Sequence, residues 1–435
     1  MQSLRLALRT LASLLFLFVV THSSSGQTDW PHWRGPNRND ITAESSGWKK
    51  GAQWPAKKDS WRVTLGDGSS SPLVVGKKVY AMGWRQNKDT VYCLDLTTGK
   101  TLWKQSYACP PYGRRSVGDQ GLYKGPSSTP EYDTETGWLY TLSTDGHLNC
   151  WNTRNQGKKV WGLNLHEGYT IDRRPQVPGS GRRDYGYTTA PLIHGDWVIV
   201  EVGAREGTVM AFQKKTGKEV WRSKLKDPAG HTGGLAPMTV EDIPCVAVFT
   251  HFHLAVIRLD KNHVGETLAK YPWVTYFANS IPTPAVHNNY VLITSSYNQG
   301  TICKLKITKN GATKVWERRA ASGVCSPIIY KGHIYWAWQR LYCLDFETGK
   351  EKWVKRWGGS PGSCIVTSDE KLIAWGGRRG QLLLLDIANP SAKRVKTLAF
   401  QPALFARHPW PHVVLANGHL LCKDRDGNMR CFAMN

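Results

Sequence analysis

Arginine and tyrosine side chains gather in two long segments of the chain, 104–125 and 163–187, and in a few shorter stretches. An arginine guanidinium binds a carboxylate or phosphate through two parallel hydrogen bonds, and a tyrosine ring can stack on a sugar. These residues could therefore recognise an acidic glycan or a peptide carboxylate. The alternative is a solvated basic surface. The candidate ligand-contacting residues are Arg114, Arg115, Arg173, Arg174, Arg182, Arg183, Tyr185, Arg340, Arg378 and Arg379.

The chain also contains ten cysteines, which in an exported protein suggests disulfides. If Asp426-Gly427 forms a two-residue turn, the hairpin register places Cys422 opposite Cys431, and this predicts a disulfide between them. Five cysteines recur at one position of a repeat and are expected to be small buried residues in separate units. They are Cys93, Cys150, Cys303, Cys343 and Cys431.

His251 and His253 offer metal-binding chemistry, because side chains two apart on a strand point to the same face. The neighbouring sequence supplies no third ligand, so no metal site is predicted. No serine, histidine and aspartate set for nucleophilic catalysis can be identified either.

A repeated unit has to position these residues. Cys93 to Trp103 recurs as Cys343 to Trp353 and, more loosely, as Ala211 to Trp221. The shared pattern is a small residue, usually an Asp, a Thr-Gly pair and a Trp, which is typical of two strands joined by a tight turn. The Trp can lie on the next unit. The predicted docking residues are Trp61, Trp103, Trp161, Trp221, Trp273, Trp316 and Trp353.

Eight first strands can be counted, most of them opening with a small residue and a Pro. Proline suits the start of a strand with a free edge. The eight begin near Pro72, Pro130, Pro191, Pro237, Pro284, Pro327, Cys364 and His412. The last unit has only three strands, and the strand at Trp61 can supply the fourth. We therefore predict an all-β, eight-bladed β-propeller with tryptophan docking, closed when the N-terminal strand pairs with the last blade.

The N-terminal residues are expected to form separate segments. Residues 1–26 carry Arg5, Arg9 and a ten-residue, mostly apolar run, the pattern of a cleaved signal peptide. Residues 27–60 are expected to be a lead-in that packs on the body, and residues 61–435 the propeller. No later run is long enough to span a bilayer, so the mature chain should lack a transmembrane segment and be periplasmic or extracellular.

The charge is strongly basic. Removing Arg5 and Arg9 with the leader lowers the formal charge from +24 to +22. Such a field attracts polyanions, so an acidic polysaccharide or an envelope protein is a reasonable partner. Nucleic acid is not expected, because export would separate the two and the basic residues form no long block. The sequence does not indicate an oligomeric state.

The repeat resembles the tryptophan-docking repeat of the eight-bladed propellers of the PQQ-like family. That family includes the quinoprotein alcohol dehydrogenases and the lipoprotein of the bacterial outer-membrane assembly machine. The segment Trp30 to Asn37 also resembles the start of exported bacterial members with no assigned chemistry. Because the family holds both enzymes and scaffolds, the resemblance implies the fold more strongly than an activity.

The resemblance also bears on cofactors. The quinoprotein dehydrogenases place two adjacent cysteines against PQQ and hold a Ca²⁺ ion with carboxylate and amide oxygens. This chain has no Cys-Cys pair and no Cys-x-x-Cys-His motif for haem. No cofactor and no catalytic residue are therefore predicted. We expect an exported, non-catalytic binding or scaffold protein; the alternatives are a PQQ-dependent oxidoreductase with Ca²⁺ and a carbohydrate-active enzyme.

Overall fold

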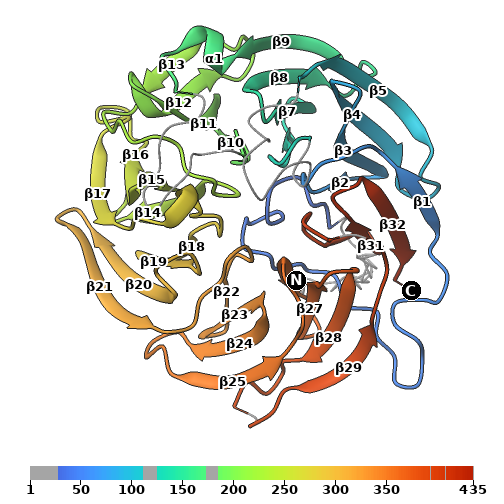
Figure 1. Cartoon of the computed structure of the whole chain (residues 1–435). Helices are drawn as coiled ribbons and strands as arrows, with labels where there is room; N and C mark the ends of the chain where they lie inside the picture. Colours follow the sequence, from blue (N-terminus) through green and yellow to red (C-terminus); the bar gives the residue numbers. More distant parts are fainter. Residues whose placement is uncertain (1–27, 111–124, 173–184, 392, 407, 435) are drawn as a thin grey trace, which may run out of the picture.

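The computed structural model describes residues 28–110, 125–172, 185–391, 393–406 and 408–434. The strands form eight four-stranded antiparallel sheets arranged as blades around a central axis (Figure 1). Helical structure in these residues consists of one turn, α1 (Leu165–Gly168), and one 3-10 turn, η1 (Tyr276–Ala278). None of the described helices is long and apolar enough to cross a bilayer. The predicted all-β, eight-bladed propeller is confirmed, whereas the predicted signal peptide lies outside the described residues.

In blades 1 to 7 the strands run from the axis outwards in chain order, whereas β1 (Trp61–Thr64) is the outermost strand of blade 8 (Figure 1). Blade 1 contains β2 (Leu73–Val75), β3 (Lys78–Arg85), β4 (Lys88–Asp95) and β5 (Thr101–Ala108). Blade 2 contains β6 (Glu131–Asp133), β7 (Trp138–Leu142), β8 (His147–Asn152) and β9 (Lys158–Asn164). Blade 3 contains β10 (Leu192–His194), β11 (Trp197–Ala204), β12 (Gly207–Gln213) and β13 (Glu219–Arg222). Blade 4 contains β14 (Ala236–Val240), β15 (Ile243–Phe249), β16 (His253–Arg258) and β17 (Thr267–Pro272).

Blades 5 to 7 repeat this order, and blade 8 combines the last three strands with β1. Blade 5 contains β18 (Ala285–His287), β19 (Tyr290–Ser295), β20 (Thr301–Thr308) and β21 (Gly311–Arg318). Blade 6 contains β22 (Ile328–Tyr330), β23 (His333–Trp338), β24 (Arg340–Asp345) and β25 (Glu351–Arg356). Blade 7 contains β26 (Gly362–Val366), β27 (Lys371–Gly376), β28 (Gln381–Asp386) and β29 (Lys396–Gln401). Blade 8 contains β30 (Val414–Ala416), β31 (His419–Lys423), β32 (Asn428–Ala433) and β1 (Trp61–Thr64).

Ring closure occurs within blade 8, as predicted. The strand β1 pairs with β32, with Trp61 opposite Cys431 and Thr64 opposite Asn428. The first described strand therefore completes the sheet begun by the last three. This arrangement covers an edge of β32 that would otherwise be open to another chain.

Indole docking joins neighbouring blades. The Nε1 of Trp61 donates to the carbonyl of Leu96 at 2.7 Å, and the indole ring lies on Gly99. The Nε1 of Trp316 likewise donates to the carbonyl of Phe346 at 3.2 Å. A Cβ at Gly99 would come within 2.7 Å of the Trp61 ring, and Gly99 has a φ of 70°. The Thr-Gly turn of the repeat therefore needs glycine both for its backbone conformation and for the indole above it.

The predicted disulfide between Cys422 and Cys431 is not formed, and both residues are free, buried cysteines. The hairpin pairs Cys422 with Arg430, whereas Cys431 pairs with Leu421. Its loop has three residues, 425–427, closed by a hydrogen bond from the Asp424 N–H to the Asn428 carbonyl at 2.9 Å. The extra loop residue shifts the register by one position, and such a shift puts two side chains on opposite faces of a sheet.

A segment before β1 crosses the centre of the ring (Figure 1). We call residues 29–42 the plug segment. Trp30 exchanges two backbone hydrogen bonds with Val74 of blade 1, at 2.7 and 3.1 Å. At the other end, the Thr42 N–H donates to Val366 of blade 7 at 2.9 Å, and the Thr42 hydroxyl donates to Leu415 of blade 8 at 3.2 Å. The plug segment thus contacts the first strands of blades on both sides of the closure.

Candidate functional site

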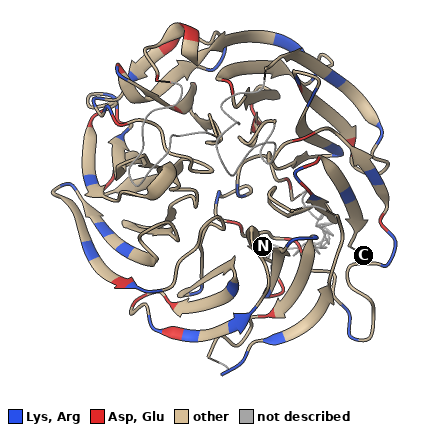
Figure 2. Cartoon of the chain, in the orientation of Figure 1, with Lys and Arg blue, Asp and Glu red and all other residues tan. Residues whose placement is uncertain are grey.

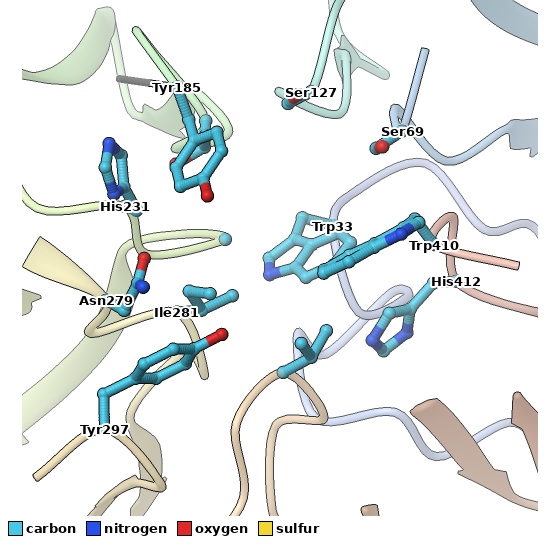
Figure 3. A pocket seen from close by; sticks show the side chains of 13 residues that line it. Trp33, Ser69, Ser127, Tyr185, His231, Asn279, Ile281, Tyr297, Trp410 and His412 are labelled. Carbon is cyan, nitrogen blue, oxygen red and sulfur yellow. The ribbon is translucent and has the colours of Figure 1, made fainter. Parts of the chain in front are cut away.

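A cavity lies beside the plug segment, which contributes Trp33 to its lining (Figure 3). Its volume is about 110 Å³, which is the scale of a cavity that holds one six-membered ring. We call it the axial cavity. Its lining comes mainly from the connectors that lead into first strands, and seven of the eight blades contribute one. The lining residues are Trp33, Ser69, Ser127, Tyr185, Thr188, His231, Gly233, Asn279, Ile281, Tyr297, Val324, Trp410 and His412.

The lining follows from the repeat. Ser69, Ser127, Thr188, Ile281 and Val324 each stand three residues before the proline that opens a first strand. Because the blades are equivalent around the axis, equivalent connector positions converge on one point. Tyr297 joins them from the β19–β20 loop, so loops of both kinds meet on the same face of the ring.

Trp33 of the plug segment forms part of the cavity wall (Figure 3). Its Nε1 donates to the Thr283 hydroxyl at 2.9 Å, and its ring lies 4.5 Å from the His412 ring between centroids. A Cβ at Gly234 would come within 2.3 Å of the Trp33 ring, and one at Gly233 within 2.7 Å. The Gly233-Gly234 pair therefore makes room for the indole.

A buried ion pair within the plug segment and a hydrogen bond to the connector before β22 fix the position of Arg34. Arg34 pairs with Asp40 and also donates to the Pro327 carbonyl at 2.6 Å. Arg34 and Asp40 have positive φ values of 66° and 61°, which are strained for residues other than glycine. This conformation persists because the surrounding contacts determine it.

Aromatic rings and imidazoles form the walls. The Tyr185 and His231 rings meet edge to face with centroids 4.9 Å apart. Burial lowers the pKa of His412, although Asp40 lies 3.5 Å from its Nδ1 and acts in the opposite direction. His412 is therefore a neutral imidazole at neutral pH, so it contributes a polar edge rather than a charge.

The described lining contains no Lys, Arg, Asp, Glu or Cys residue. It combines ring faces with small hydroxyl and amide groups, which suits stacking and short hydrogen bonds to a neutral group. PQQ carries three carboxylates, and its Ca²⁺ ion needs carboxylate as well as amide oxygens. Among the described lining residues only Asn279 offers such an amide, so this set does not fit PQQ with Ca²⁺.

The structure separates the predicted ligand-contacting residues. Tyr185 lines the axial cavity. Arg340, at the start of β24, and Arg378 and Arg379, in the β27–β28 turn, are exposed and do not line it. The remaining predicted residues, Arg114, Arg115, Arg173, Arg174, Arg182 and Arg183, lie outside the described residues.

Basic residues are spread widely over the molecule. Figure 2 shows Lys and Arg on strands and loops all round the ring rather than in a single sector. Many of those on the outer strands are exposed, including Lys104 and Lys158. For the described residues, this distribution fits the solvated basic surface better than one concentrated anion site.

The fold and the axial cavity define an eight-bladed propeller with a plugged axis and a ring-sized cavity whose described lining is aromatic and uncharged. A family model described as "Outer membrane protein assembly factor BamB" matches residues 87–355, more than half of the chain. The chain belongs to this PQQ-like repeat family, which confirms the resemblance drawn from its docking repeats.

Two relatives show partial matches. The dehydrogenase subunit of the quinone alcohol dehydrogenase of Gluconobacter oxydans is 32% identical over 158 residues, covering 35% of this chain and 18% of the relative. A quinohemoprotein alcohol dehydrogenase of Pseudomonas putida is 26% identical over 171 residues, covering 38% of this chain and 20% of the relative. Each match spans a fifth or less of the relative.

Solved structures match over more of the chain. BamB from Moraxella catarrhalis superposes with a TM-score of 0.56 at 14% identity, covering 86% of this chain and 99% of BamB. The C-terminal WD40 domain of Sif2 gives a TM-score of 0.53 at 11% identity, covering 86% and 97%. At these identities the matches show the fold alone.

Proposed function

We propose that this chain is an exported, non-catalytic binding protein that holds a side chain of a partner protein in the axial cavity. The observation that carries the proposal is the convergence of aromatic and small polar residues on a ring-sized space. An aromatic side chain of an extended peptide could stack on Trp33 and Trp410. Ser69, Ser127 and Asn279 could hydrogen-bond its amide groups.

The kind of partner follows from the chemistry of the lining and from the family. An acidic polysaccharide would need cations, and the described lining supplies none. The family is described by an assembly factor for outer membrane proteins, which supports a protein partner. The exposed Arg340, Arg378 and Arg379 would then contribute attraction at long range rather than contacts within the cavity.

Export is part of the proposal and rests on the leader-like residues 1–26. Protein sequencing of the chain from the envelope fraction of its host should give a first residue close to position 27. A chain that retains Met1 would refute this part of the proposal.

The enzymatic alternatives have less support from the site. The quinone dehydrogenase relatives favour an oxidoreductase, but the described lining does not fit their cofactor. Most glycosidases need a pair of carboxyl groups across the cleaved bond, and the described lining contains none. The binding function accounts for the lining without a reacting group.

Selection from a random peptide library tests the proposal, using full-length mature protein and a variant with a filled cavity. Peptides with a recurring aromatic residue should bind the unaltered protein. Ser127→Phe places a ring in the cavity and should weaken that binding roughly tenfold or more. Ser106→Phe adds the same ring at an exposed position on β5 and should bind like the unaltered protein.

Two results would contradict the proposal. One is equal peptide affinity in the Ser127→Phe variant, measured by calorimetry on protein that unfolds at the normal temperature. The other is an absorbance change on adding PQQ and Ca²⁺, accompanied by dye-linked oxidation of an alcohol or sugar. The second result would establish the oxidoreductase instead.

A further inference from the structure

Three potential metal ligands meet at the boundary between blades 1 and 2, and none of them lines the axial cavity. The sulfur of Cys109, a carboxylate oxygen of Asp145 and an imidazole nitrogen of His147 all lie within 4.8 Å of one another. Cys109 and Asp145 are buried, and His147 is partly exposed. We propose that these three side chains bind a Zn²⁺ ion, whose usual protein ligands are thiolate, imidazole and carboxylate.

Local structure explains how residues 36 or more positions apart converge. Cys109 directly follows β5, and its N–H donates to the Asn87 carbonyl of the β3–β4 turn at 2.8 Å. Asp145 and His147 flank Gly146 in the β7–β8 turn, which is closed by a hydrogen bond from the Gly146 N–H to Ser143 at 3.1 Å. Gly146 has a φ of 88°, a conformation that glycine adopts freely.

The spacing of the ligand atoms is close to what zinc requires. With a Zn–S distance of about 2.3 Å and Zn–N and Zn–O distances of about 2.1 Å, tetrahedral ligand atoms lie about 3.4 to 3.6 Å apart. His147 Nδ1 and Asp145 Oδ2 are 3.8 Å apart. The widest separation in the cluster, up to 4.8 Å, therefore has to shrink by about 1 Å.

Neighbouring side chains orient the proposed ligands. The Asn164 amide nitrogen donates to the Asp145 carbonyl at 3.3 Å and also lies 3.3 Å from the His147 Nε2. The Tyr107 ring packs against the His147 ring at 5.5 Å between centroids. The ring packing restricts the orientations open to the His147 imidazole.

The electrostatic environment favours a cation. The carboxylates of Asp89 and Asp145 lie close to the Cys109 thiol. Asp89 accepts a hydrogen bond from the Tyr107 hydroxyl at 3.3 Å, so it too belongs to this region. Asp89, Asp145 and His147 have further contacts that a bound ion would partly replace. A dication would compensate for the gathered carboxylates and stabilise a thiolate. Three protein ligands leave a fourth position for Asp89 or water.

Titration of the full-length mature protein with Zn²⁺ and Co²⁺ tests the site. The protein is first treated with a chelator and must carry no polyhistidine tag. We expect one high-affinity Zn²⁺ per chain in competition with a chromophoric chelator. Co²⁺ should give a near-ultraviolet absorption band from thiolate-to-cobalt charge transfer, which requires a cysteine ligand. Cys109→Ala should abolish the band, and His147→Gln should weaken Zn²⁺ binding roughly tenfold or more.

The chain provides matched controls for both variants. Cys150→Ala removes another buried cysteine, and His263→Gln removes an exposed imidazole that also has a carboxylate neighbour, Glu266, at 3.0 Å. Both controls should bind metal like the unaltered protein, and circular dichroism melting shows whether each variant is folded. No stoichiometric binding, or full binding with the band retained in Cys109→Ala, would overturn the proposal. Failure of the axial cavity to bind peptides would leave this result unaffected.

Discussion

One buried carboxylate, that of Glu131, ties the plug segment to two blades. It pairs with Arg38, lies 3.2 Å from the His32 Nδ1, and accepts a hydrogen bond from the Ile193 N–H at 3.1 Å. Burial by itself would raise the pKa of Glu131, but the nearby charges of Arg38 and His32 and their hydrogen bonds outweigh it and bring the pKa to about 2. The ionised form is therefore the one that the folded protein stabilises.

Acid should weaken the fold through this residue. Because the pKa of Glu131 is about 2 in the folded protein and 4.5 as its ordinary value, its contribution is fully present above pH 4.5. It is lost as the pH falls towards 2. Glu131→Gln should therefore lower the free energy of unfolding near neutral pH, on the order of 3 kcal/mol, and should lose the acid-dependent part. Urea unfolding at a series of pH values measures both effects.

Glu266→Gln is the control, since Glu266 pairs with Lys224 and His263 at the surface. Its stability should change little, because solvent screens exposed pairs. If Glu131→Gln and the unaltered protein had parallel stability curves between pH 2 and 4.5, Glu131 would not be the ionised anchor of the plug segment.

Only part of the site could be predicted at this scale. Tyr185 could be predicted because it lies near the end of a segment rich in Arg and Tyr. Ser69, Ser127 and Thr188 could have been found from their fixed place before the strand-opening prolines. Trp33 and the three metal-ligand candidates could not, because nothing in the local sequence says which distant residues a plug or a turn will face.

Among the elements, the indole on the neighbouring turn is the contact that recurs most clearly. Trp61, Trp161 and Trp316 donate to carbonyls of the next blade, and each ring covers the glycine of a Thr-Gly turn. Trp103 lies in the same way on Gly157 of blade 2. The repeat therefore encodes both a turn and the surface on which the preceding blade rests.

Trp316 and Gly349 should be energetically coupled. Trp316→Ala removes a buried ring and should cost about 3–5 kcal/mol of stability. Gly349→Ala adds a Cβ that would lie 2.8 Å from that ring, at a φ of 65°. In the double variant the clash disappears. The double variant should therefore lose less stability than the sum of the losses in the two single variants. Urea unfolding of the four proteins gives the coupling energy.

Gly332 provides the matched glycine, since its φ is 73° and no atom lies within 4 Å of an added Cβ. Gly332→Ala carries only the backbone strain and should destabilise less than Gly349→Ala. Equal costs at the two glycines, or strict additivity with Trp316→Ala, would mean that the indole does not select glycine at the turn.

The strands were largely predictable because each repeat carries sequence signals for where its strands begin and turn. The prolines mark first strands, the Thr-Gly pairs mark the turns before fourth strands, and the Trp61 strand was recognisable from the missing fourth strand of blade 8. The β31–β32 hairpin shows the limit. Asp426-Gly427 suits a two-residue turn or the last two residues of a three-residue loop, and the local sequence alone does not distinguish them.

For the molecule as a whole, the N-terminal residues have two separate structural roles. The plug segment crosses the axis and contacts blades 1, 2, 7 and 8, while β1 completes blade 8. The axial cavity depends on the plug segment, because Trp33 forms part of its wall. Closure of the ring depends on the pairing of β1 with β32. Two deletions that end on either side of β1 can separate these roles.

Deleting residues 28–60 should remove the plug segment but keep β1, leaving a closed ring of lower stability that remains monodisperse if the unaltered protein is. Deleting residues 28–64 also removes β1, so β32 becomes an edge strand. Its unpaired N–H and C=O groups, together with the buried surface of Cys431 and Met429, would then be open to another chain. We expect the longer deletion to associate or aggregate. Size-exclusion chromatography and urea unfolding distinguish the two, and identical behaviour of both deletions would show that β1 does not close the ring.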